Sequence, residues 1–268
     1  MEVGDEDNGK EQGKERGMVL SGLRRSGFPF QTLITHAVMA EAPNGWSVHR
    51  TEFPWQTPGG NEARFLDLLA EKAGFSLAVE CKKRRDDVLT FLRPVGVAET
   101  TGNNVERFTC LHIKRRPAAY MGLEIYPEEW MLRPGSTESE FCVVGKGERD
   151  ALEADAAFVV RAADAFAESI RRLNEIQGGR LPIDSQLVLP VIVTNAPLYS
   201  VRYQPSEVSL ETGEFDELPR EIERERWVRF RKSFTADTRF EIAERSVFVV
   251  NAAHFQDFLR QLQRIPRE

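Results

Sequence analysis

The stretch RFLDLLAEKAGFSLAVEC, from Arg64 to Cys81, decides the fold that the sequence predicts. It consists of two short apolar segments on either side of Ala73-Gly74, and a glycine there tolerates the positive φ that a tight hairpin turn needs. In the register that this turn imposes, Asp67 on the first strand lies directly opposite Glu80 on the second. Directly opposed residues on one face of a sheet have Cβ atoms roughly 5 Å apart.

Alternation along the strands divides the hairpin into two faces. Because side chains alternate with a period of two, Lys82 shares the face of Glu80. The other face is expected to turn an apolar surface toward the core, formed by Leu66, Leu68, Leu77, Val79 and Cys81. The first face, which is expected to point away from the core, then carries the two acids Asp67 and Glu80 and the amine of Lys82.

Two carboxylates at this separation repel each other, so the pKa of one of them rises unless a cation lies between them. Mg²⁺ suits such a place, because it prefers oxygen ligands and is usually held by one or two carboxylates and by water. Lys82 would then orient or deprotonate a water molecule, or neutralise charge in the transition state. The alternative is an ordinary surface ion pair between Glu80 and Lys82, which contributes about 0–1 kcal/mol.

An acid on one strand and Glu-x-Lys on the next resembles the PD-(D/E)xK nuclease superfamily, here as Asp67 and Glu80-Cys81-Lys82. Ser26 to Gln31 (SGFPFQ) is similar to the opening of the first helix of that family, and Trp46 to Trp55 is similar to its first strand. Gln31 stands where the family often has an acid. An amide there orders a metal-bound water but brings no charge.

The resemblance implies an α/β fold of the restriction endonuclease-like kind, a mixed β-sheet flanked by helices. It implies that the metal is held by Asp67, Glu80 and the backbone carbonyl of Cys81. The cofactor would be Mg²⁺, with Mn²⁺ as a substitute. The implied activity is a hydrolase, an endonuclease that cuts nucleic-acid phosphodiester bonds, with DNA the favoured partner.

Lys82 is followed by three further basic residues, Lys83, Arg84 and Arg85, which we expect to contact phosphates that flank the scissile bond. The alternative is that Asp86 and Asp87 neutralise part of this run. The whole chain has a net charge of −6. Its acids are concentrated in three segments, so the remainder, which includes the hairpin, is net positive. Those segments are 1–17, 148–177 and 211–226.

Composition limits the class of protein. A chain of 268 residues with 41% apolar residues can bury a substantial core. No run of about 18 apolar residues occurs, so no membrane span is expected. Three cysteines without close spacing indicate a reducing, cytoplasmic setting. The four histidines are scattered, and no Gly-x-Ser-x-Gly elbow or phosphate-binding glycine loop occurs, which disfavours zinc sites, serine acyl transfer and ATP binding.

Along the chain we expect a disordered acidic tail at 1–17 and a single nuclease-like domain at 18–268, with an insertion or elaborated edge at about 95–146. Residues 187–194 (LVLPVIVT) are expected to extend the sheet on the far side of the catalytic hairpin. Helices are expected at 29–39, 148–177 and 254–264. Strands are expected at 47–53, 64–71, 76–82, 107–114, 140–144, 187–194, 199–203, 226–234 and 247–251. Residues 86–92 are expected to form a turn or short helix, 115–137 an irregular segment and 204–225 a charged loop.

The sequence therefore predicts a metal-dependent nuclease. A second interpretation is a non-catalytic nucleic-acid-binding or assembly module that keeps the fold, which the amide at Gln31 and the acidic net charge favour. A hydrolase of small phosphoesters is a third. Two-strand cleavage by such folds often needs two copies, so a homodimer or a protein partner in a defence-type complex is compatible with the resemblance.

Overall fold

The computed structural model describes residues 5–56, 62–84, 87–96, 102, 104–115, 122–145, 151–215, 217–233 and 244–266. Its helices are α1 (Asp5–Arg25), α2 (Phe28–Ala40), α3 (Ala151–Ile176) and α4 (Phe255–Gln261), with 3-10 turns at Ala42–Asn44, Pro205–Glu207 and Ala252–His254. Its strands are β1 (Ser47–Trp55), β2 (Arg64–Lys72), β3 (Phe75–Lys82), β4 (Leu89–Pro94), β5 (Val105–Arg115), β6 (Leu123–Ser139), β7 (Phe141–Val144), β8 (Ser185–Thr194), β9 (Leu198–Tyr203), β10 (Glu221–Glu225), β11 (Trp227–Ser233), β12 (Glu244–Asn251) and β13 (Gln263–Arg264).

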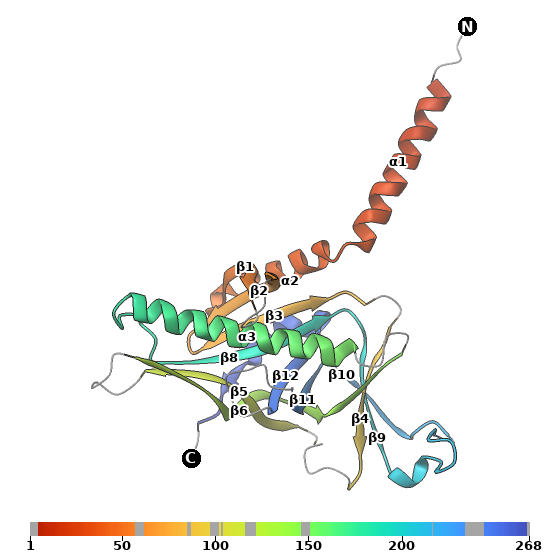
Figure 1. The fold of residues 1–268 in the computed structure, drawn as a ribbon. Helices are drawn as coiled ribbons and strands as arrows, with labels where there is room; N and C mark the ends of the chain where they lie inside the picture. The colour runs from red at the N-terminus through yellow and green to blue at the C-terminus, as the bar shows by residue number, and fades with distance from the viewer. Residues whose placement is uncertain are drawn as a thin grey trace.

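The larger sheet is mixed, and β8 lies at its centre (Figure 1). Strands β1, β2 and β3 form an antiparallel meander. Strand β3 then pairs in parallel with β8 over its whole length, from Phe75 beside Leu187 to Lys82 beside Thr194. This confirms the expectation that LVLPVIVT extends the sheet beyond the hairpin. It also places the ends of β3 and β8 at the same edge of the sheet.

The sheet forks at β8. The first residues of β8, 185–188, pair with β5, whereas 191–194 pair with β12. The long strand β6 joins the two arms, because its first part pairs with β5 and its last part pairs with β11, the partner of β12. The pairings β8–β5–β6–β11–β12 therefore form a closed circuit, and β8 is hydrogen-bonded on both of its edges.

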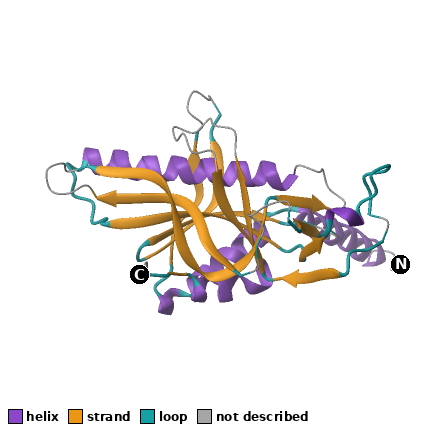
Figure 2. Ribbon diagram, turned by 90° about the horizontal axis from the view of Figure 1, so that it is seen from below, coloured by secondary structure: helices purple, strands orange, loops and turns teal. Residues whose placement is uncertain are grey.

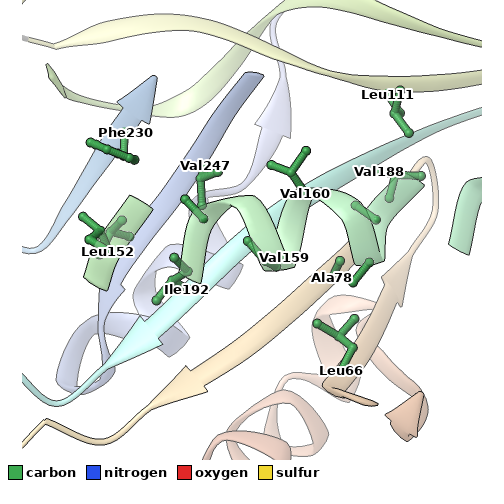
Figure 3. Close-up of a cluster of buried hydrophobic side chains, with 14 of the residues drawn as sticks. Leu66, Ala78, Leu111, Leu152, Val159, Val160, Val188, Ile192, Phe230 and Val247 are labelled. Carbon is green, nitrogen blue, oxygen red and sulfur yellow. The ribbon is translucent and has the colours of Figure 1, made fainter. Parts of the chain in front are cut away.

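Helices cover both faces of this sheet (Figure 2). Apolar residues recur along α3 at helical spacing, and its buried side chains pack against one face, where Val159 and Val160 lie over the strands that carry Val188 and Val247 (Figure 3). Helices α2 and α4 cover the other face, which carries a second buried cluster. Neighbouring residues of one strand enter different clusters, as expected for a strand buried on both faces: Val247 belongs to the first and Phe248 to the second.

A smaller sheet, in the order β10-β9-β4-β7, lies beside the larger one. The prediction of a turn or helix at 86–92 is wrong, because Leu89 and Phe91 alternate into the core beneath α3 as residues of β4. The charged segment 204–225 likewise ends in a strand, β10, which pairs with β9. Both strands have polar surroundings in the sequence, and only pairing with β9 identifies them.

The irregular segment expected at 115–137 is also wrong from Leu123 onward, where the 17-residue strand β6 begins. Residues 116–121 lie outside the described residues. The prolines of this segment indicated an irregular backbone. Pro127 is tolerated because β6 pairs with β5 alone at this point, so the missing N–H need not cost a ladder bond. Residues 95–146 are therefore an integral part of both sheets where the structure describes them. The last helix ends earlier than expected, at Gln261, because Gln263 and Arg264 pair with β6.

Helix α1 extends away from the two sheets (Figure 1). In the segment 1–17, which we expected to be a disordered tail, the backbone is drawn as a helix from Asp5 onward, and the expectation of disorder stays a prediction. Lys, Glu, Gln and Arg lose little rotamer freedom in a helix, and a helix satisfies most of its own backbone hydrogen bonds without a core. The polarity of this segment therefore indicated exposure and said little about its backbone. The remaining expected elements correspond to α2, α3, β1–β3, β5, β7–β9, β11 and β12, with ends that differ by a few residues.

A buried arginine ties the arms of the fork together. Arg229 of β11 is fully buried, and its guanidinium donates to the carbonyl oxygens of Leu132 (2.9 Å), Pro134 (3.1 Å) and Arg107. The same group lies over the rings of Phe108 and Phe248, at 5.8 and 5.3 Å from their centroids. Burial lowers the pKa of Arg229 to about 10, so the side chain stays charged at neutral pH. It thus satisfies backbone acceptors of β5 and β6 from a third strand.

We expect Arg229→Met to lower the free energy of unfolding by about 2–4 kcal/mol, because three buried carbonyl groups lose their donor. Urea denaturation measures this loss, and Arg202→Met, at a half-exposed arginine of β9, is the matched control with an expected change within about 0.5 kcal/mol. Equal free energies of unfolding in both variants would contradict a stabilising role for the Arg229 hydrogen bonds.

Candidate active site

The hairpin of β2 and β3 has the register that the sequence predicts. The ladder runs from Lys72 beside Phe75 to Leu68 beside Val79, around a turn in which Gly74 has a φ of 81°. The next pair along would be Asp67 and Glu80. There the side chain of Asp67 replaces the backbone, because its Oδ2 accepts a hydrogen bond from the amide of Cys81 at 2.7 Å.

One part of the expected facial pattern is wrong. Leu68, Leu77, Val79 and Cys81 do pack on the face covered by α2 and α4, but Leu66 packs into the cluster beneath α3. The faces of β2 therefore exchange between Leu66 and Leu68, around Asp67. A strand that twists this sharply is not visible in an alternating sequence pattern.

Glu80 and Lys82 lie under the first turns of α3, where they join an ion-pair network. Lys82 Nζ is 2.9 Å from Glu80 Oε1 and 3.1 Å from Asp155 Oδ1 of α3. The other oxygen of Asp155 binds Arg84 at 2.8 Å, and Arg84 lies 3.7 Å from Asp87. Lys82 also lies over the ring of Phe158 at 5.9 Å from its centroid. The network is thus built by both the sheet and the helix above it.

The two carboxyl groups of the hairpin are partly deprived of water. Glu80 is 7% exposed, and burial, together with the charge of Asp67, raises its pKa to about 7. Burial likewise raises the pKa of Asp67, against the opposing effects of the Cys81 amide and Lys82. The second oxygen of Glu80, Oε2, is buried without a hydrogen-bond partner. A bound cation stabilises a buried carboxylate most where one of its oxygens has no hydrogen-bond donor.

The acids around Lys82 favour the charged form of its amine. Burial acts to lower its pKa, but Glu80 and Asp155 outweigh this and leave the pKa raised. The amine therefore stays protonated at neutral pH. Of the roles that the sequence leaves open for Lys82, the orientation of water and the neutralisation of charge fit this state, and the deprotonation of water does not.

Gln31 lies on α2, next to the hairpin. Its Nε2 donates to Glu52 Oε1 at 2.6 Å and to the backbone carbonyl of Asp67 at 2.9 Å. It therefore fixes the backbone that carries Asp67. The role predicted for Gln31, an amide beside a metal-bound water, stays a prediction.

Two acids near the site escaped the sequence analysis. Glu52 lies across from Asp67 on β1, its charge raises the pKa of Asp67, and its φ of 50° is unusual for a residue other than glycine. No sequence signal distinguishes it. Asp155 lies on α3, in the acidic segment 148–177 that the charge distribution set apart from the hairpin. Its spacing from Leu152 and Val159, at three and four residues, places it on the apolar stripe and could have identified it.

The basic run that follows β3 is held mostly by the protein itself. Lys83 Nζ donates to the carbonyl oxygens of Arg24 (2.7 Å) and Ser26 (3.1 Å), at the junction of α1 and α2. The backbone amide of Arg84 donates to Asn195 Oδ1 at 2.7 Å, and its guanidinium binds the acids described above. Arg85 lies outside the described residues. The phosphate contacts predicted for this run therefore compete with internal partners.

The residues present suit a cation with few protein ligands. Among the residues that the structure describes, no group of three or more His, Cys, Asp or Glu side chains is placed to enclose a metal ion. Asp67 and Glu80 supply two carboxylates, one with an unsatisfied buried oxygen. That set matches Mg²⁺, which commonly takes one or two carboxylates and keeps several waters. Cys81 adds no thiolate, since burial raises the pKa of its thiol.

Comparison of the chain with protein-family models, with curated proteins and with solved structures found no match in any of the three. Within the described residues, no helix combines the length and apolar character that a membrane crossing requires. The chemistry of the site must therefore be judged from its own geometry.

The pH dependence of stability tests the environment of Glu80. Its folded-state pKa of about 7 lies above the ordinary 4.5, so the metal-free protein loses stability as the pH rises through 7. Glu80→Gln removes this charge. Its free energy of unfolding in EDTA should equal that of the wild type near pH 4 and exceed it by roughly 2–3 kcal/mol near pH 8.5. Urea titrations at both pH values measure this, and the same difference at both would contradict a raised pKa.

Proposed function

We propose that this protein is a Mg²⁺-dependent nuclease with a restriction endonuclease-like core of the PD-(D/E)xK type. The observation that carries the proposal is the pair of partly buried carboxyl groups, Asp67 and Glu80, at the end of the hairpin, with Lys82 bound to Glu80 and with Glu80 Oε2 unsatisfied. An ordinary surface ion pair has no need of a second buried acid, and burying one is costly without a cation.

The order of elements supports the proposal. Helix α2 precedes the meander of β1, β2 and β3, and β8 pairs in parallel with β3 after the helix α3. This arrangement places Glu80 and Lys82 toward the end of a strand that is buried on both faces. Side chains at the carboxyl edge of parallel strands are held by a rigid sheet yet lie next to solvent, which suits a ligand site.

Each residue has a role in the proposed reaction. Asp67 and Glu80 would hold the ion, which when bound lowers the pKa of a water molecule and neutralises charge on a phosphate. Lys82, as an ammonium ion, stabilises the negative charge that develops on the scissile phosphate. Asp155 positions Lys82 at 3.1 Å, and Gln31 fixes the backbone of Asp67 at 2.9 Å.

Cleavage assays test this function. Supercoiled plasmid and labelled single- and double-stranded DNA and RNA are incubated with Mg²⁺, Mn²⁺ or EDTA. The wild type should cut at least one polymer in a metal-dependent way, and Glu80→Gln or Asp67→Asn should lower the rate by at least about 100-fold.

The matched control is Glu71→Gln. It changes an acid near the turn end of β2, the strand that also carries Asp67, and should leave the cleavage rate nearly unchanged. Melting temperatures of all variants show whether each is folded. Failure of the folded wild type to cut any of these polymers, or equal rates in wild type and Glu80→Gln, would contradict the proposed nuclease.

A binding module without catalysis is the second candidate, and a basic hollow favours it. A hollow of about 710 Å³ is lined by three arginines and one acid, together with Trp227 and neighbouring residues of β6 and the C-terminal segment. The charged residues are Glu106, Arg133, Arg226 and Arg260. Arg133 and Arg260 have acidic partners, whereas Arg226 lies over the ring of Trp227 at 5.2 Å from its centroid. Arginine forks are suited to phosphate oxygens.

If this hollow contacts a nucleic-acid backbone, Arg226→Ala combined with Arg133→Ala should weaken binding and reduce the slope of log affinity against log salt by about 2. Fluorescence anisotropy with a labelled oligonucleotide in EDTA measures both quantities. Arg172→Ala, at an exposed arginine of α3, is the control. An unchanged slope in the double variant would exclude the hollow from the binding surface.

A further inference from the structure

A second group of chemically matched side chains lies at the other end of β8. His112 of β5 has its Nδ1 2.8 Å from Glu128 Oε2 of β6 and its Nε2 2.9 Å from Ser185 Oγ, at the first residue of β8. Arg264 of β13 donates to the same Ser185 oxygen at 2.9 Å. Lys82 pairs with Thr194 at the opposite end of β8, so the two sites are separated by roughly 30 Å of strand.

The hydrogen-bond partners fix where the protons lie. A carboxylate can only accept, so Nδ1 of the neutral His112 carries the ring hydrogen, and Ser185 Oγ, which accepts from Arg264, directs its own hydrogen to Nε2. Nε2 is then the unprotonated nitrogen. The hydrogen on Nδ1 is donated to the carboxylate of Glu128. Acid, imidazole and hydroxyl are thus arranged in the order and tautomer that activate a serine as a nucleophile.

The surroundings keep the imidazole neutral and ready to accept a proton. His112 is 4% exposed and lies against the rings of Tyr126 and Trp130, at 5.3 and 5.1 Å between centroids. Burial lowers its pKa, against the opposing effect of Glu128, and Arg264 and Lys114 lower it further. Ser185 itself is only half-buried.

We propose that Ser185 is an activated nucleophile, with His112 as its general base and Glu128 as the group that orients His112, and that it accepts the acyl group of a carboxylic ester. These three residues come from three strands, and Ser185 has no glycine elbow around it. The sequence pattern for serine acyl transfer therefore could not reveal them. This activity is independent of the metal-dependent site.

The step is balanced as follows. Ser185 Oγ forms a bond to the ester carbonyl carbon while its proton passes to His112 Nε2. The C–O bond to the alcohol then breaks, the alcohol leaves with that proton, and an acyl-serine remains. Water attacks this ester with His112 again as base, which releases the carboxylic acid and restores the serine. Arg264, whose guanidinium donates to Ser185 Oγ, favours loss of the serine proton to His112.

A fluorophosphonate probe tests the nucleophile directly, because Ser185 Oγ would displace fluoride from phosphorus and His112 would take the proton. The full-length protein is incubated with the probe in EDTA, and intact mass and peptide mapping give the site and rate of labelling. We expect one label per chain, on Ser185. Labelling should be absent in Ser185→Ala and slower by at least about 100-fold in His112→Gln.

Glu128→Gln keeps the shape of the side chain and provides a milder variant in case His112→Gln does not fold; it should also label more slowly. Ser169→Ala, at an exposed serine of α3, should label as the wild type does. Hydrolysis of p-nitrophenyl acetate should follow the same order. A folded wild type that labels no faster than Ser185→Ala, or that labels at another serine, would overturn the proposal, whatever the outcome of the nuclease assays.

Discussion

Strand β8 is the element on which the rest of the structure depends. Its residues 187–194 are buried, β3 is paired along one edge, and β5 and β12 divide the other edge between them. A strand of this kind must satisfy every backbone group through neighbouring strands, because no water reaches it. The hairpin, the closed circuit of strands and the helices on both faces are therefore arranged around one apolar segment, and both candidate sites lie at its ends.

Buried charge is distributed unevenly over this framework. Arg229 donates to three backbone carbonyl oxygens, whereas Glu80 is buried close to Asp67, whose charge opposes its ionisation. Lys82 offsets part of this cost, whereas the charge of Asp155 adds to it. Buried carboxylates whose negative charge is only partly balanced in the free protein are suited to bind a positively charged ligand.

The hairpin could be predicted because its information is local. Ala73-Gly74 sets the turn and the turn sets the register, so the approach of Asp67 to the end of β3 follows from a short stretch of sequence. The contributions of Glu52 and Asp155 could not be predicted in the same way. Glu52 depends on an unusual backbone conformation, and Asp155 depends on which strand lies beneath the first turn of α3.

By itself, the sequence determined the apolar strands, the long amphipathic helix and the acidic hairpin, because each depends on the spacing of residues close together in the chain. The tertiary structure alone decided that β6 is one long strand in spite of its prolines, and that the two arms of the sheet close on β8. It also brought His112, Glu128 and Ser185 together from three strands. These features rest on pairing between distant segments, and the hydrogen bonds that create them leave no periodic trace in any one segment.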